Sequence, residues 1–169
     1  MAETRVLSFT NPATGEQFGQ VPMATSEDIR QAYADLRQRF PEWSSKPVQE
    51  RARILGKLQE VLIDSADEIT AVLNRDTGKS RQDALIELWM TVDLLRVNRR
   101  YAARWLKRVP VPRGYYMFKR CYYEPRPYGV VLVISPWNYP FYLAMPPVIS
   151  ALLAGNTVIL KPSEVTGAT

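Results

Sequence analysis

The sequence contains no histidine and only one cysteine, Cys121. Histidine is the commonest general base and metal ligand near neutral pH, so chemistry that depends on an imidazole is excluded. One thiol without an imidazole also argues against a structural zinc site, and we predict no metal site. A single cysteine cannot form an internal disulfide and fits a reducing compartment, which predicts a cytoplasmic location.

Charge is missing from one long stretch, because no residue from Pro127 to Leu160 is charged. On length alone this stretch could cross a bilayer. Four prolines interrupt it, at positions 136, 140, 146 and 147. A membrane-spanning helix must satisfy its own backbone hydrogen bonds, and each proline inside it removes a donor. We therefore predict no transmembrane segment. The N-terminal stretch MAETRVLSFTNPATGE has no apolar core, and we expect no signal peptide.

Positive charge is concentrated in one block. The chain of 169 residues has a formal net charge of +5, but the segment from Arg96 to Arg126 holds ten basic residues against one acid, Glu124. Aromatic residues are interleaved with these charges, as in some nucleic-acid-binding surfaces. No nucleic-acid motif accompanies them, so we favour a solvated helix face followed by an arm that meets a neighbouring subunit. A nucleic-acid or membrane-surface binder is the alternative.

The remaining composition is that of a globular protein, with 46% hydrophobic and 23% charged residues. Turn signals and apolar spacing predict short strands at 5–9 and 17–21, then four helices. The first starts at Ser26, Pro47 opens the second, Gly78 ends the third, and the fourth runs from about Gln82 to Lys107. On the second helix five apolar side chains are spaced to face inward, namely Ile54, Leu55, Leu58, Val61 and Leu62.

Two apolar runs, 130–134 and 157–160, flank a helix-like segment at 143–153 and predict a β-α-β unit. The connection is long enough for the right-handed crossover that parallel strands require. Both runs are almost wholly apolar, which predicts strands that are covered on both faces. Ligands of such sheets bind at the carboxyl ends of the strands. Polar residues follow both runs there, at 135–138 and 161–164.

The motifs at these two ends resemble the N-terminal portion of the NAD(P)-dependent aldehyde dehydrogenase superfamily. The resemblance is carried by PWNYPF after the strand GVVLVIS, by AGNTVILKPSE, and by NPATGE near the start. It covers essentially the whole chain. It implies an α/β fold in which an N-terminal helical lead-in precedes the first β-α-β of a Rossmann-like parallel sheet. It also implies an enzyme that oxidises an aldehyde to a carboxylic acid with NAD(P)+.

The resemblance assigns a catalytic role to Asn138. In this family a thiolate attacks the aldehyde carbon, a hydride passes to the nicotinamide, and water hydrolyses the thioester. Asn138 matches the asparagine whose side-chain amide donates to the oxyanion of the tetrahedral adduct. The residues alone leave an alternative to the catalytic role, in which the Asn138 amide caps the strand-to-helix turn.

The resemblance also assigns a cofactor site. Lys161 and Glu164 match the pair that holds the adenosine ribose, where a carboxylate accepts both hydroxyls and repels a 2′-phosphate. We therefore expect NAD as cofactor, with NADP possible; a solvent-exposed ion pair is the alternative. Further cofactor contacts are expected from Ser135, Pro136, Trp137, Pro162 and Ser163. Tyr139 and Tyr142 match positions that line the family's substrate tunnel, although core packing would also explain them and Trp137.

The sequence departs from the family pattern by its extent. The family's glycine-rich phosphate turn, catalytic cysteine and glutamate base correspond to positions after Thr169, so we expect a truncated member that is inactive alone. Cys121 precedes the first sheet strand and has no histidine as base, and we expect it to be structural or incidental.

We predict three parts. Residues 1–113 form a helical lead-in of the NAD-binding domain, 114–127 an extended oligomerisation arm, and 128–169 the first, incomplete β-α-β of the dinucleotide-binding domain. The expected partners are an aldehyde and further copies of the chain, bound through the arm. A non-catalytic dinucleotide-binding or assembly module is the alternative.

Overall fold

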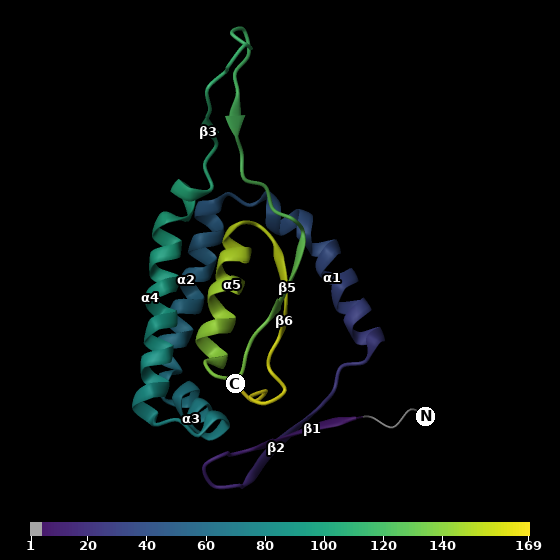
Figure 1. Cartoon of the computed structure of the whole chain (residues 1–169), viewed down its shortest axis with the longest axis vertical. Coiled ribbons are helices and arrows are strands. Elements are labelled where there is room, and N and C mark those ends of the chain that lie inside the picture. The colour runs from purple at the N-terminus through teal and green to yellow at the C-terminus, as the bar shows by residue number, and fades with distance from the viewer. Residues whose placement is uncertain (1–4) are drawn as a thin grey trace.

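The computed structural model describes residues 5–169 (Figure 1). The first residues of the N-terminal stretch, for which we expect no signal peptide, lie outside this range. The elements in chain order are β1 (Val6–Thr10), β2 (Gln17–Pro22), α1 (Ser26–Ser45), α2 (Val48–Asp64), α3 (Ala66–Thr77), α4 (Arg81–Trp105), β3 (Val109–Pro110), β4 (Tyr122–Tyr123), β5 (Val130–Ile134), α5 (Pro140–Leu153) and β6 (Thr157–Lys161). The α/β class is confirmed, and helices precede the β-α-β unit as predicted.

The sequence signals at the helix ends act as expected. Thr25 and Asp28 form a capping box at the start of α1, in which each backbone N–H donates to the partner's side chain. The backbone N–H and the hydroxyl of Thr25 lower the pKa of Asp28. Gly78 ends α3 with a φ of 71°, a left-handed conformation that glycine adopts without strain.

Strands β5 and β6 are parallel, and α5 is the crossover between them. Val130 pairs with Thr157 at one end and Ile134 with Lys161 at the other. The pairing continues one residue further, because the N–H of Ser135 donates to the carbonyl of Lys161 at 3.1 Å. Both polar strand ends therefore lie at one edge of the sheet.

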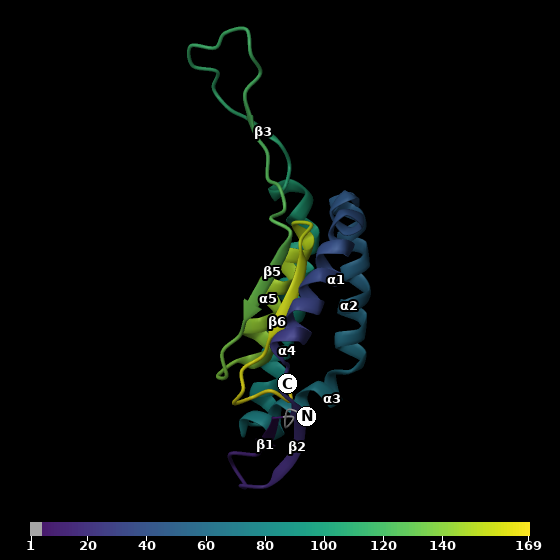
Figure 2. The same ribbon diagram turned by 90° about the vertical axis from the view of Figure 1, so that its right-hand side faces the viewer.

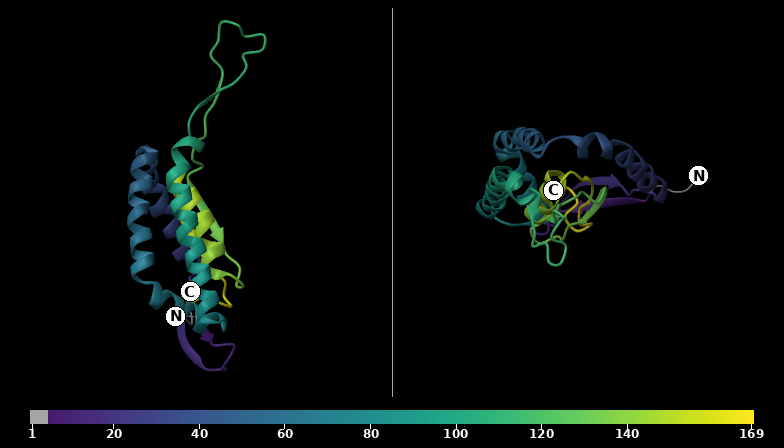
Figure 3. Two further views of the ribbon diagram at one scale, coloured as in Figure 1. Left: turned by 90° about the vertical axis from the view of Figure 1, so that its left-hand side faces the viewer. Right: turned by 90° about the horizontal axis from the view of Figure 1, so that it is seen from above.

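The core lies where α5 packs against α2 and α4 (Figures 1 and 3). One buried cluster joins the three helices and contains Leu55, Leu62, Leu88, Leu95, Ala102, Ile149 and Leu153. On its other side α5 contacts both strands of the sheet, and α1 contacts them as well. Removing this apolar surface from water holds the β-α-β unit on the helices.

Strands β3 and β4 form a hairpin that projects from the end of α4 (Figures 1 and 2). Tyr115 and Phe118, in the loop between them, are 102% and 99% exposed. An extended arm was predicted from the β-formers at 115–124, and the hairpin also includes residues that precede position 114.

The structure corrects the prediction that the sheet strands are covered on both faces. Val133 is buried, but Leu132 and Ile134 on the same strand are 59% and 65% exposed. Side chains alternate between the faces of a strand, so Leu132 and Ile134 point away from the face that Val133 packs on. Among residues 5–169 no element covers them there, and this face of the sheet is open.

Two smaller predictions were also wrong. Val61 was expected to face inward, yet it is 56% exposed, because the buried stripe of α2 follows Arg51, Leu55 and Leu62 and leaves Val61 at its margin. The crossover helix starts at Pro140 and not at Leu143, since proline suits the first helical position. Across residues 5–169 no helix combines the length and apolar character that crossing a bilayer requires.

Asn156 connects the end of α5 to the start of β5. Its buried side chain accepts hydrogen bonds from the N–H groups of Tyr128 and Gly129 at 2.7 and 3.0 Å, and donates to the carbonyl of Ala151 at 3.0 Å. A single amide therefore fixes where the first sheet strand begins relative to the crossover helix.

We predict that Asn156→Ala lowers the free energy of unfolding by about 2 kcal/mol, because it leaves buried N–H groups without an acceptor. Urea unfolding would measure the change. Gln38→Ala, an exposed position on α1, is the control and should alter stability by no more than about 0.5 kcal/mol. Equal effects of the two substitutions would contradict the role given to Asn156.

Candidate functional site

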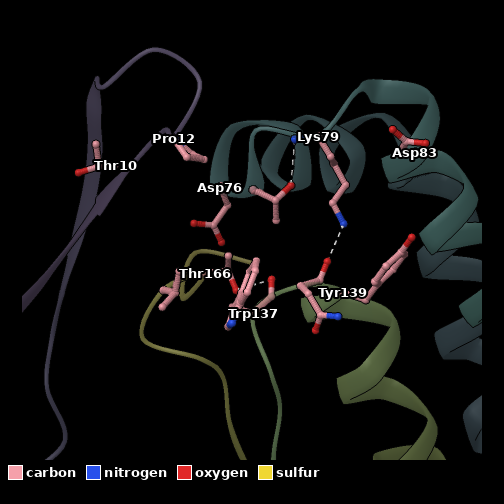
Figure 4. Close-up of a pocket in the computed structure, with 11 residues that line it drawn as sticks. Thr10, Pro12, Asp76, Lys79, Asp83, Trp137, Tyr139 and Thr166 are labelled. Carbon is pink, nitrogen blue, oxygen red and sulfur yellow. Dashed lines mark hydrogen bonds between the residues drawn. The ribbon is translucent and has the colours of Figure 1, made fainter.

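The loops that follow β5 and β6 lie side by side (Figure 4). The hydroxyl of Thr166 donates to the carbonyl of Trp137 at 3.4 Å, which joins the second loop to the first. Together with the bond from Ser135 to Lys161, this contact brings residues 135–139 next to 161–166. The structure thus gathers the predicted site residues at one edge.

Lys161 and Glu164 form an ion pair with Nζ and Oε2 at 3.0 Å. Both side chains are largely exposed, at 51% and 69%, so the pair itself adds little stability. The backbone N–H of Glu164 itself, followed by Lys161, lowers the pKa of this carboxyl. The edge therefore presents an ionised carboxylate and an ammonium group next to each other.

The remaining cofactor candidates differ in exposure. Ser135 and Ser163 are buried; the Ser163 hydroxyl accepts from the N–H of Val165 at 3.2 Å, whereas that of Ser135 has no hydrogen-bond partner in the described part of the chain. Pro136 and Pro162 are exposed. Trp137 is 60% exposed, which excludes core packing for it within these residues.

Asn138 lies between β5 and the first turn of α5. Its carbonyl accepts from Nζ of Lys79 at 3.5 Å, while its exposed side-chain amide forms no hydrogen bond within residues 5–169. The amide is therefore no local cap of the strand-to-helix turn, which was the alternative to a catalytic role. It borders a cavity of ≈ 390 Å³ lined by Thr10, Pro12, Asp76, Thr77, Lys79, Asp83, Trp137, Tyr139, Val165 and Thr166 (Figure 4).

Tyr139 and Tyr142 line a second, smaller cavity of ≈ 310 Å³ between α4 and α5. Its other walls are mainly apolar and come from Asp83, Ile86, Met90 and Leu143. Tyr139 also borders the cavity next to Asn138, so the two hollows meet at this side chain.

Asp76, an acidic residue that no sequence pattern pointed to, is 2% exposed and lies beside this edge. Its Oδ2 accepts from the N–H of Ala168 at 3.1 Å and from the hydroxyl of Thr169 at 2.7 Å. Burial raises the pKa of Asp76, and the bond from Thr169 partly opposes this shift. The carboxyl ties the segment after Glu164 to the end of α3.

Lys79 and Glu87 were missed as well, and they form an ion pair next to Asn138. Glu87 is completely buried. The sequence held a signal for it, because Ala84, Leu88, Thr91 and Leu95 form the buried stripe of α4 and Glu87 falls within that stripe. A charged residue at a core-facing position has to be paired, and its partner marks a structured site.

We predict that Lys161→Met raises the pKa of Glu164 part of the way towards that of an ordinary glutamate, because the bond from its own backbone N–H is kept. Since the folded-state pKa is lowered, the carboxylate favours the folded chain above its unfolded pKa, and this contribution is lost as pH falls through the folded pKa. A carboxyl carbon NMR titration measures the shift. Lys57→Met on α2 is the control, and an unchanged pKa in Lys161→Met would contradict the pairing.

Known proteins of one family resemble this chain over nearly its whole length. The model of the aldehyde dehydrogenase family matches residues 1–169. The chain is 39% identical over 161 residues to 4,4'-diapolycopene aldehyde oxidase of a Methylomonas species, covering 94% of this chain and 30% of that protein.

Two solved structures extend the comparison. An aldehyde dehydrogenase from Brucella melitensis biovar abortus 2308 superimposes with a TM-score of 0.91 and 28% identity over 97% of this chain and 34% of the other. An NAD-dependent benzaldehyde dehydrogenase from Corynebacterium glutamicum gives 0.88 and 27%, over 96% and 35%. The chain thus spans about a third of the length of the proteins it matches, and it belongs to the aldehyde dehydrogenase family.

Proposed function

We propose that this chain supplies the oxyanion donor and the cofactor-ribose pair of an NAD(P)-dependent aldehyde dehydrogenase. The observation that carries the proposal is the position of Asn138 and of the Lys161–Glu164 pair at one edge of a parallel sheet. Ligands of parallel α/β sheets bind at this edge, outside the carboxyl ends of the strands. The helices that precede β5 then form the lead-in of a Rossmann-like domain.

Asn138 acts on the oxygen of the aldehyde. When a thiolate attacks the carbonyl carbon, negative charge develops on this oxygen, and the free side-chain amide of Asn138 donates a hydrogen bond to it. The amide is exposed to the cavity and engaged by no other group of residues 5–169. It therefore needs no rearrangement to act as a donor.

Glu164 and Lys161 hold the adenosine end of the dinucleotide. The Glu164 carboxylate accepts hydrogen bonds from the two ribose hydroxyls, and the Lys161 ammonium, 3.0 Å from it, adds a donor. A carboxylate at this point repels a 2′-phosphate, which favours NAD over NADP. A dinucleotide held by these two residues would supply the hydride acceptor for the oxidation.

The aldehyde occupies the cavity lined by Tyr139 and Tyr142. Ile86, Met90 and Leu143 make its walls largely apolar, which suits a substrate with an apolar body. The resemblance of WNYPF to members that act on medium-chain, fatty or aromatic aldehydes points the same way.

The attacking thiolate comes from residues outside this chain, so that residues 1–169 alone do not oxidise aldehydes. Cys121 lies on the hairpin between β3 and β4, at the opposite end of the molecule from the Lys161–Glu164 edge (Figure 1). Its neighbours in the hollow it borders are basic and apolar residues of the same hairpin. No substrate could contact Asn138 and Cys121 of one chain together.

The hairpin serves assembly in this proposal. The aromatic side chains at its tip are exposed and would be covered by another subunit. Some of its basic residues form ion pairs within the hairpin segment itself. Arg108 and Arg126 both pair with Glu124, at 3.0 and 2.9 Å, and the Arg108 guanidinium lies 3.8 Å from the ring centre of Tyr122. These contacts favour a subunit arm over the nucleic-acid or membrane-surface alternative.

We predict that Asn138→Ala in the full-length product of the source gene lowers kcat for aldehyde oxidation by about 100- to 1000-fold, the usual loss for one oxyanion donor. Steady-state NADH formation measures it. Cys121→Ser, on the hairpin, is the matched control and should keep full activity. A kcat that survives Asn138→Ala, or one that is abolished in Cys121→Ser, would contradict the assignment.

A further inference from the structure

The N-terminus of helix α5 is not capped by the side chain of its own N-cap residue. The residue before it is Tyr139, whose side chain forms no capping hydrogen bond, and its first residue is Pro140, which has no N–H. The first intrahelical bond runs from the N–H of Leu143 to the carbonyl of Tyr139 at 2.8 Å. The N–H groups of Phe141 and Tyr142 must therefore find acceptors outside the helix.

Glu87, on α4, supplies the acceptor for both. Its Oε1 lies 2.9 Å from the backbone N of Phe141 and 3.0 Å from that of Tyr142. Because the carboxylate sits at the positive end of the helix dipole, the arrangement is favourable in charge as well as in geometry. Glu87, more than fifty positions away in sequence, thus caps the N-terminus of α5.

The other carboxylate oxygen of Glu87 is held by Lys79. The ammonium group of Lys79 pairs with Oε2 of Glu87, donates to the carbonyl of Asn138 at 3.5 Å, and lies 4.6 Å from the ring centre of Tyr139. Lys79 is itself fixed next to Gly78, because its carbonyl accepts from the side-chain amide of Asn74 at 2.5 Å. The Asn138 carbonyl and the residues that follow it are therefore tied to one buried ion pair.

We propose that Glu87, held by Lys79, is the positioning residue for Asn138, an inference that rests on the function proposed above. Asn138 has no side-chain bond of its own within residues 5–169, so the direction of its amide depends on the backbone at 138–142. Glu87 holds that backbone at the N–H groups of Phe141 and Tyr142, and Lys79 holds it at the carbonyl of Asn138. The pair sets where the oxyanion donor points without touching the substrate.

The test is a double-mutant cycle in the full-length product of the source gene. Glu87→Gln keeps the size and one acceptor oxygen but removes the charge, and it should lower kcat about 10- to 100-fold, since small displacements of a catalytic group cost this much. The KM for NAD should stay within about two-fold, because Lys161 and Glu164 follow the other strand. In an Asn138→Ala background the same substitution should cost no more than about three-fold.

The matched controls lie at the other end of α5. Arg51→Gln removes a buried charge that donates to the carbonyl of Leu153 at 3.0 Å, and Trp43→Phe removes the indole donor to Leu152 at 3.0 Å. Both should lower the melting temperature, and Trp43→Phe should leave kcat within about two-fold. Lys79→Met breaks the same ion pair from its other side, leaves Glu87 with only its two backbone N–H donors, and should lower kcat in the same direction as Glu87→Gln.

Hydrogen–deuterium exchange gives a readout that does not depend on activity. Glu87→Leu should speed exchange in the peptide covering 138–143 about ten-fold or more and leave exchange at 149–154 unchanged. Arg51→Gln should speed exchange at 149–154 and leave exchange at 138–143 unchanged. Unchanged exchange at 138–143, or a loss of kcat that is as large in the Asn138→Ala background, would overturn the positioning role. If Asn138→Ala alone has no effect on kcat, the proposed function fails, and the exchange data alone decide whether Glu87 holds this turn.

Discussion

The helix α5 is held between two buried charges of opposite sign, and the rest of the structure depends on this arrangement. Glu87 accepts from the first free N–H groups of the helix, and Arg51, 5% exposed, donates to the carbonyl of Leu153 in its last turn. A carboxylate at the N-terminal end and a guanidinium at the C-terminal end both favour the helix dipole. Each charge would be costly to bury alone, and each is paired with backbone groups that would otherwise be unsatisfied.

This arrangement fixes the sheet edge, because α5 connects the two strands. Gly155 follows the helix with a φ of 97°, a conformation that residues with a side chain rarely adopt, so glycine is needed to turn the chain into β6. Asn156 then holds the start of β5. With both strands in register, Asn138 and the Lys161–Glu164 pair lie at the same edge of the sheet, so the fold alone brings the proposed site residues together. Such preorganisation is what electrostatic stabilisation of an oxyanion requires.

Local sequence signals predicted the order and type of the elements well, since caps, glycines and apolar spacing act within a few residues. The end of β5 at Ile134 and the helix stop at Gly78 are examples. What depends on distant residues was missed. The start of α5 at Pro140 relies on Glu87 from α4, and no local pattern contains that contact. The open face at Leu132 and Ile134 was missed because apolarity shows that a strand can be covered, not that the covering element is present. The roles of the site residues came from family resemblance, and the geometry adds their proximity.

The most direct measurement is a crystal structure of the full-length product of the source gene with NAD+ bound. The account predicts the adenosine ribose hydroxyls within hydrogen-bond distance of the Glu164 carboxylate and Lys161, with the Asn138 amide facing the site where the aldehyde oxygen lies. Phe141 and Tyr142 should still donate to Glu87. A dinucleotide bound away from the ends of β5 and β6, or an Asn138 amide turned away from the substrate, would contradict it.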